Sequence, residues 1–148
     1  MSSLKILFGT ESGNAELVAD DVAEAFETAG IKAEVVAMED FDVADLPDAG
    51  TVVVITSTYG EGELPATTAP FQEALEADRP SLSALRYAGF GLGDSTYETY
   101  NNAIGLLTAQ LRELGASQIG DIGKHDAVSG ESFTDAAVAW ANTIVPAL

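Results

Sequence analysis

A short turn near the start of the sequence, Thr10-Glu11-Ser12-Gly13-Asn14, holds the residues best suited to chemistry. It follows an apolar run at residues 4–8 and precedes a segment with helical spacing at residues 14–29. Backbone N–H groups in the first turn of a helix have no partner within the helix, and the helix dipole favours negative charge there. Hydroxyl side chains, a glycine and an asparagine at such a turn therefore predict a phosphate site.

The turn contains neither lysine nor arginine. A nucleotide-hydrolysis loop would place a lysine on the phosphates, and a dinucleotide fold would show G-x-G-x-x-G spacing, so the turn fits neither. The phosphate would be held by neutral donors. The competing interpretation is that Thr10, Ser12 and Asn14 only cap the helix that follows.

The elements that must position this turn alternate between strand and helix. Apolar patterning predicts strands at residues 5–8, 33–37, 51–56, 87–92 and 117–122, and helices at residues 14–29, 71–77, 100–114 and 134–148. This alternation indicates an α/β fold, a three-layer sandwich with a five-stranded parallel sheet in the order 2-1-3-4-5 and helices on both faces. A single domain over residues 1–148 is expected from the length.

Ligands of such sheets bind beyond the carboxyl ends of the strands, where the strand order reverses. This rule brings together the loops after strands one, three and four. Tyr59 lies beside Gly60 and Gly62 in the second of these loops, and Tyr97 lies in the third. Two tyrosines on neighbouring loops can flank a flat ring by stacking. With the phosphate turn, they predict a flat aromatic ligand that carries one phosphate.

With these three motifs the chain resembles a flavodoxin, a protein that carries electrons on bound FMN. Residues 10–15 are similar to the family's phosphate loop, Tyr59 to the aromatic on one flavin face, and the segment 93–97 to the third loop, whose tyrosine stacks on the other face. The resemblance extends over the whole chain and implies FMN as the cofactor. The residues expected to bind it are Thr10, Glu11, Ser12, Gly13, Asn14, Ala15, Ser57, Thr58, Tyr59, Gly60, Gly62, Gly93, Asp94, Tyr97, Tyr100 and Asn101.

The subtype follows from two further comparisons within the family. The fifth strand is expected to run uninterrupted from Ser117, which resembles the short-chain class. The segments 59–65 and 97–101 are similar to the FMN domains of diflavin reductases and to stand-alone relatives of the MioC type. Ala15 stands where many flavodoxins have a threonine. The missing hydroxyl predicts weaker phosphate binding, by about 0.5–1.5 kcal/mol for a neutral hydrogen bond or about 1.5–3 kcal/mol for one to a charged group.

Several of these residues also have a purely structural interpretation. Tyr59 would then be a surface aromatic, and Tyr100 would pack at the start of its helix without touching flavin. Asp94 either accepts hydrogen bonds from the isoalloxazine edge or orders its own loop. Glu61, Glu63 and Glu98 are interpreted as solvated charges. The backbone at Gly60 is expected to supply a carbonyl to the flavin N5–H, because a peptide that reorients needs a residue without Cβ.

The chain is strongly acidic, with 24 acidic and 6 basic residues and a formal net charge of −18. Nucleic acid and anionic membranes are unsuitable partners, because binding them requires cations. Redox proteins with basic docking surfaces fit the charge, and the resemblance implies a flavodoxin reductase as donor and acceptor enzymes beyond it. Salt adaptation explains the same charge equally well. We expect a monomer.

Other features restrict the chemistry and the compartment. The sequence has no cysteine, which excludes disulfides and iron–sulfur clusters. The single histidine, His125, is expected in a solvated loop. No apolar run approaches 18 residues and no signal-peptide pattern is present at the start, so a cytoplasmic protein is expected.

No set of residues is suited to acid–base or nucleophilic catalysis, so the chemistry is expected to belong to the cofactor. The expected function is an FMN-binding electron carrier, a flavoprotein of electron transport that works through a flavin semiquinone and is not itself an enzyme. One alternative is an NAD(P)H-dependent FMN quinone or flavin reductase, although no nucleotide fingerprint is visible. The other is a signalling receiver domain, which would need an acidic pocket where the chain has Gly9-Thr10 and Ser57-Thr58.

Overall fold

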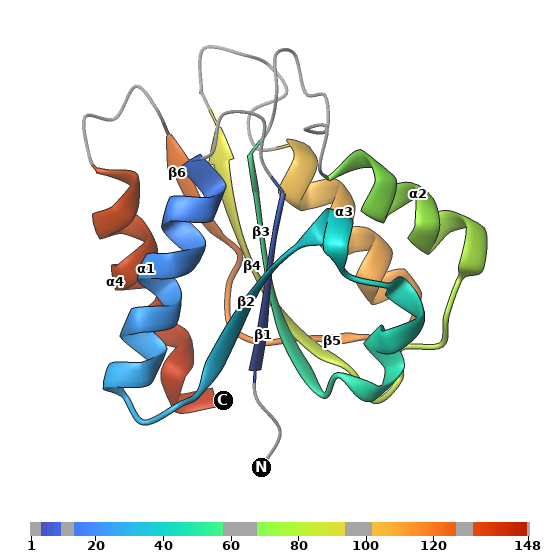
Figure 1. The fold of residues 1–148 in the computed structure, drawn as a ribbon, viewed down its shortest axis with the longest axis horizontal. Coiled ribbons are helices and arrows are strands. Elements are labelled where there is room, and N and C mark those ends of the chain that lie inside the picture. Colours follow the sequence, from blue (N-terminus) through green and yellow to red (C-terminus); the bar gives the residue numbers. More distant parts are fainter. Residues whose placement is uncertain (1–3, 10–13, 58–67, 94–101, 127–131, 148) are drawn as a thin grey trace.

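The computed structural model describes residues 4–9, 14–57, 68–93, 102–126 and 132–147. A central parallel sheet is covered by helices on both faces (Figure 1). Helices α1 (Asn14–Thr28) and α4 (Phe133–Ile144) lie side by side on one face. Helices α2 (Ala69–Asp78) and α3 (Asn102–Glu113) lie on the other. This is the predicted three-layer arrangement.

The strands follow the predicted order. They are β1 (Leu4–Gly9), β2 (Ala33–Ala37), β3 (Thr51–Ser57), β4 (Arg86–Gly93), β5 (Ser117–Gln118) and β6 (Gly123–Asp126). All pairs are parallel in the order β2-β1-β3-β4-β5, and β6 also pairs with β4. Short 3₁₀ turns lie at Met38–Asp40, Val43–Asp48 and Val145–Ala147. The α/β fold and the order 2-1-3-4-5 are confirmed.

The prediction of an uninterrupted strand at residues 117–122 is wrong. β5 ends at Gln118, the chain leaves the sheet, and β6 resumes pairing with β4 at Gly123. Gly120 turns the chain with φ +62°, and the indole N–H of Trp140 donates to the carbonyl oxygen of Asp121 at 2.9 Å. The interruption is far shorter than the insertion of a long-chain flavodoxin.

The placement of His125 also differs from the prediction of a solvated loop. It lies within β6 and is only 8% exposed. Its ring meets that of Phe133 edge-on, with centroids 6.1 Å apart and planes at 81°. His125 is buried because β6 extends the sheet beneath the start of α4.

Two apolar cores hold the layers together. Alternate residues of β3 point to opposite faces, so Val53 and Ile55 join the core beneath α1 and α4 while Val52 and Val54 join the core beneath α2 and α3. This double burial explains the nearly continuous apolar sequence of β3.

The helix boundaries follow local signals. Gly30, with φ +86°, ends α1, and Ile31 N–H closes the last turn on the carbonyl oxygen of Phe26 at 2.9 Å. The last helix was predicted to continue to residue 148, but α4 ends at Ile144 and a 3₁₀ turn containing Pro146 follows. Among the described residues, none of the helices has the length and apolarity needed to cross a membrane.

Candidate functional site

The carboxyl ends of the strands meet at one edge of the sheet, toward the top of Figure 1. Gly9 at the end of β1 lies in register with Thr56 of β3, and Gly93 at the end of β4 lies in register with Asp126 of β6. β1 is flanked by β2 on one side and β3 on the other, so the direction of winding reverses between β1 and β3. Such a reversal is where sheets of this type bind their ligands.

The predicted phosphate turn leads from this edge into α1. The helix begins at Asn14, which is exposed. Because only residues 10–13 separate it from the end of β1, its first turn of backbone N–H groups lies at the carboxyl end of that strand. Ala15 is fully buried and packs in the core beneath α1. Because alanine has no polar side chain, Ala15 could act on a phosphate only through its backbone N–H.

Of the predicted site residues, the structure describes Asn14, Ala15, Ser57 and Gly93, and it brings them to the same edge of the sheet. Ser57 is half-buried at the last position of β3. The other predicted residues lie outside the described residues, and they are Thr10, Glu11, Ser12, Gly13, Thr58, Tyr59, Gly60, Gly62, Asp94, Tyr97, Tyr100 and Asn101. Their roles stay predictions.

A buried pair of hydroxyls at this edge was missed by the sequence interpretation. Oγ1 of Thr56 lies 2.8 Å from Oγ1 of Thr68, and both residues are fully buried. Thr68 stands directly before α2. In the sequence, this pair is visible only as one threonine just before and one just after the segment 58–67, which does not by itself predict a contact between them.

Acidic side chains gather beside the same edge. A hollow of about 490 Å³ is lined by Phe8, Glu16, Asp20, Val35, Ala37, Glu39 and Asp40. Phe8 stands one residue before the end of β1, and Glu16 lies in the first turn of α1. These carboxylates place negative charge close to the start of the phosphate turn. Within the described part of the chain, no cluster of side chains could hold a metal ion.

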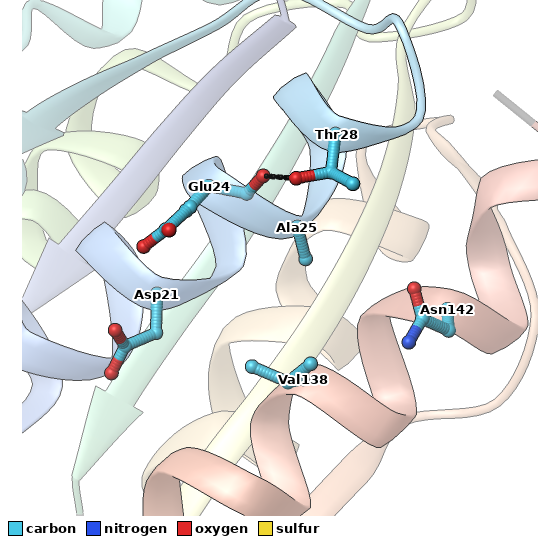
Figure 2. Close-up of a pocket in the computed structure, with 6 residues that line it drawn as sticks. All are labelled: Asp21, Glu24, Ala25, Thr28, Val138 and Asn142. Atoms are coloured by element: carbon cyan, nitrogen blue, oxygen red, sulfur yellow. Dashed lines mark hydrogen bonds between the residues drawn. The ribbon is translucent and has the colours of Figure 1, made fainter.

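A second hollow, of about 360 Å³, lies between α1 and α4 (Figure 2). It is lined by Asp21, Glu24, Ala25, Thr28, Val138 and Asn142. Thr28 Oγ1 donates to the carbonyl oxygen of Glu24 at 2.9 Å, so this hydroxyl is already used within α1. The hollow lies in an outer helical layer, along the second half of α1, and none of the four predicted cofactor residues that the structure describes lines it.

Comparison with known proteins decides the family. Residues 6–140 match the family described as Flavodoxin. The chain belongs to the flavodoxin family. It is 36% identical to Protein MioC of Escherichia coli K12 over 140 residues, covering 95% of this chain and 94% of MioC.

Two further relatives place the chain within this family. It is 34% identical to the NADPH–cytochrome P450 reductase of Aspergillus oryzae over 158 aligned residues, covering 97% of this chain and 23% of the reductase. The oxidised Flavodoxin 1 of Bacillus cereus has the same fold, with a TM-score of 0.85, 26% identity and 99% of both chains covered. The chain is thus a short-chain, MioC-like flavodoxin related to the FMN domains of diflavin reductases.

Membership of this family gives FMN as the cofactor. The described residues fit such a group at the carboxyl edge. The first turn of α1 begins at this edge, and the N–H groups of a first helical turn have no partner within the helix, which suits a phosphate. Gly93, the last residue of β4, carries no side chain that could obstruct a ligand at this edge.

Proposed function

We propose that this flavodoxin-family protein is an electron carrier that takes electrons from a reductase and delivers them one at a time to acceptor redox enzymes. The family match, combined with the reversal of winding between β1 and β3, carries this proposal. Bound FMN supplies the redox chemistry, because it can exchange single electrons. The protein supplies binding, orientation and electrostatics.

The phosphate is proposed to bind at the start of α1, where the first-turn N–H groups and the helix dipole favour an anion. The flavin ring is proposed to lie between the loops that follow β3 and β4, with Tyr59 and Tyr97 on its two faces. Ser57 and Gly93, the last residues of these strands, support this arrangement, because both loops begin at the edge where α1 starts.

The acidic surface beside this edge is proposed to tune the cofactor. Glu16, Asp20, Glu39 and Asp40 line the hollow next to the end of β1. Nearby negative charges disfavour the addition of each electron that makes the cofactor anionic. We therefore expect the second one-electron potential to be lower than that of free FMN.

Five of the six basic residues lie away from the carboxyl edge, which is proposed to dock a basic partner; the sixth, Lys124, lies in β6 in register with Gly91, near the end of β4. Lys5 and Arg86 lie near the amino ends of β1 and β4, and Lys32 directly precedes β2. Arg79 and Arg112 lie at the far ends of α2 and α3, which run back toward the amino edge. The four carboxylates of the hollow beside the carboxyl edge would attract a redox partner with a basic docking surface.

A reconstituted electron-transfer assay tests this function. The FMN-loaded protein is mixed with NADPH alone, and then with NADPH, a flavodoxin reductase and cytochrome c as the acceptor. We expect no NADPH oxidation in the first mixture and reduction of cytochrome c in the second. Rapid NADPH oxidation by the protein alone would contradict the proposal and identify an NAD(P)H-dependent flavin or quinone reductase instead.

A pair of variants on one helix tests the docking surface. Glu16 and Glu27 are both exposed residues of α1, but Glu16 lies in its first turn and Glu27 near its far end. Glu16→Gln should slow reductase-driven electron transfer at low ionic strength, and the difference should shrink as salt is added. Glu27→Gln is the control, and equal slowing by both variants would argue against docking at the cofactor edge.

A further inference from the structure

The buried pair formed by Thr56 and Thr68, called the threonine pair below, connects the two ends of the predicted flavin loop at residues 58–67. The two Oγ1 atoms are 2.8 Å apart, and Oγ1 of Thr56 also donates to the carbonyl oxygen of Ser57 at 3.1 Å. Each hydroxyl has only one proton. Both contacts therefore form together only if Thr68 donates to Thr56 while Thr56 donates to Ser57.

The hydroxyl of Thr68 serves this tertiary contact and not its own helix. Thr68 occupies the N-cap position of α2, where a threonine commonly accepts a hydrogen bond from the first turn. Here the side chain makes no capping bond. The hydroxyl turns toward the end of β3, so it secures the position of the strand relative to the helix.

The same side chain also contacts the end of β1. A Cβ built on Gly9 would lie 1.8 Å from Oγ1 and 2.9 Å from Cβ of Thr68, so the threonine fills the space above this glycine. Gly9 pairs in register with Thr56 and directly precedes Thr10 of the phosphate turn. One buried side chain thus contacts the residue that leads into the phosphate turn and the strand that leads into the loop bearing Tyr59.

We infer that the threonine pair is a positioning element of the FMN site. It fixes the last residues of β1 and β3 relative to each other, so that the phosphate turn and the loop after β3 begin from a defined spacing before FMN binds. A site held in its binding geometry loses less free energy to ordering when the ligand arrives. The inference rests on the proposed placement of FMN at the carboxyl edge.

Thr68→Val tests this role, because valine keeps the shape of threonine and removes the hydroxyl. We expect the dissociation constant of FMN to rise about 3- to 10-fold, the range expected for one ordinary hydrogen bond. It is measured by fluorescence as the apoprotein is titrated into FMN. The one-electron potentials of the bound cofactor should shift as well, which a uniform loss of stability would not produce. Thr68→Ser keeps the hydroxyl and should restore both properties.

Thr108→Val is the matched control. Thr108 is 6% exposed, and its hydroxyl donates to the carbonyl oxygen of Ile104 at 2.8 Å within α3. The chemical change is the same, but the lost bond is local to a helix. We expect FMN affinity and both potentials to match those of the wild type.

Two results would overturn the inference: wild-type affinity and potentials in Thr68→Val, or equal weakening of FMN binding by Thr68→Val and Thr108→Val. If the Thr68→Val apoprotein does not fold by circular dichroism, Thr56→Val breaks the same pair from the strand, with the same expected and contrary results. A wild-type protein that bound no FMN would overturn the placement of the cofactor and the inference together. Wild-type FMN binding with an unaffected Thr68→Val would overturn the inference alone.

Discussion

Replacing Gly9 by alanine should disrupt the junction between β1, β3 and α2. The added Cβ would lie 1.8 Å from Oγ1 and 2.9 Å from Cβ of Thr68, whereas ordinary contact begins near 3.4 Å. Rotation of Thr68 would move Oγ1 away but leave its Cβ too close. The backbone of β1 has little freedom to shift, because β2 and β3 pair with it on both sides.

The magnitude follows from two contributions. Overpacking of a buried site costs about 1–3 kcal/mol. Displacing Thr68 also breaks the hydrogen bond to Thr56, which contributes about 0.5–1.5 kcal/mol. We therefore expect Gly9→Ala to lower the free energy of unfolding by about 1.5–4.5 kcal/mol.

Urea unfolding followed by far-ultraviolet circular dichroism measures this change. Gly105→Ala is the control, because Gly105 is exposed in α3 and an added Cβ meets nothing within 4 Å. It should stabilise the protein by up to about 1 kcal/mol through helix propensity. In a Thr68→Gly background both clashing atoms of Thr68 are absent, and the remaining close atom, Sδ of Met38 at 3.0 Å, belongs to a flexible side chain that can move, so Gly9→Ala should cost less than about 1 kcal/mol. An unchanged urea midpoint for Gly9→Ala, or the same cost in both backgrounds, would refute this steric reasoning.

Three further predictions concern the rest of the molecule. Trp140→Phe should destabilise the protein by about 1–3 kcal/mol in urea unfolding, because the indole N–H no longer bonds to the carbonyl oxygen of Asp121; an unchanged midpoint would contradict this. Burial raises the pKa of Tyr87 above 10.0, although the charge of Arg112 opposes the shift. The proton is therefore held more tightly in the folded state, and the resulting stability should be lost as the pH rises above 10.0 through the folded pKa. In Tyr87→Phe the free energy of unfolding should depend less on pH in this range, and an unchanged pH dependence would contradict this prediction. FMN binding should tighten with added salt, because screening relieves repulsion between the phosphate and a chain of net charge −18; a flat or opposite dependence of the dissociation constant would contradict this.

Sequence patterns were sufficient for most of the architecture. The apolar run at residues 51–56 predicted a strand, and β3 matches it with the addition of Ser57. The helical spacing after Asn14 and the glycine at position 30 predicted α1 to within one residue. These features succeed because burial and chain reversal leave a periodic signal within a few neighbouring residues.

The end of the sheet shows where local patterns fail. Ile119 and Ile122 resembled the apolar positions of one strand, but Gly120 turns the chain between them. The residue that secures this break, Trp140, is distant in sequence. His125 likewise lies in a strand, β6, although its polar neighbours in sequence gave no strand pattern.

The candidate site was predictable only in part. The reversal between β1 and β3 follows from strand order, and the start of α1 at this edge follows from a turn of small polar residues. Thr68 was not predictable, because its position before a helix indicates a cap, whereas its hydroxyl bonds to Thr56 on a strand. Such a contact depends on how the helix packs against the sheet, which no local pattern specifies.

A potentiometric titration of the FMN-loaded protein, followed by its visible absorption spectrum, tests the central claim most directly. We expect two separate one-electron steps, the second at a potential below that of free FMN. A single two-electron step, or a second potential equal to or above that of free FMN, would contradict it.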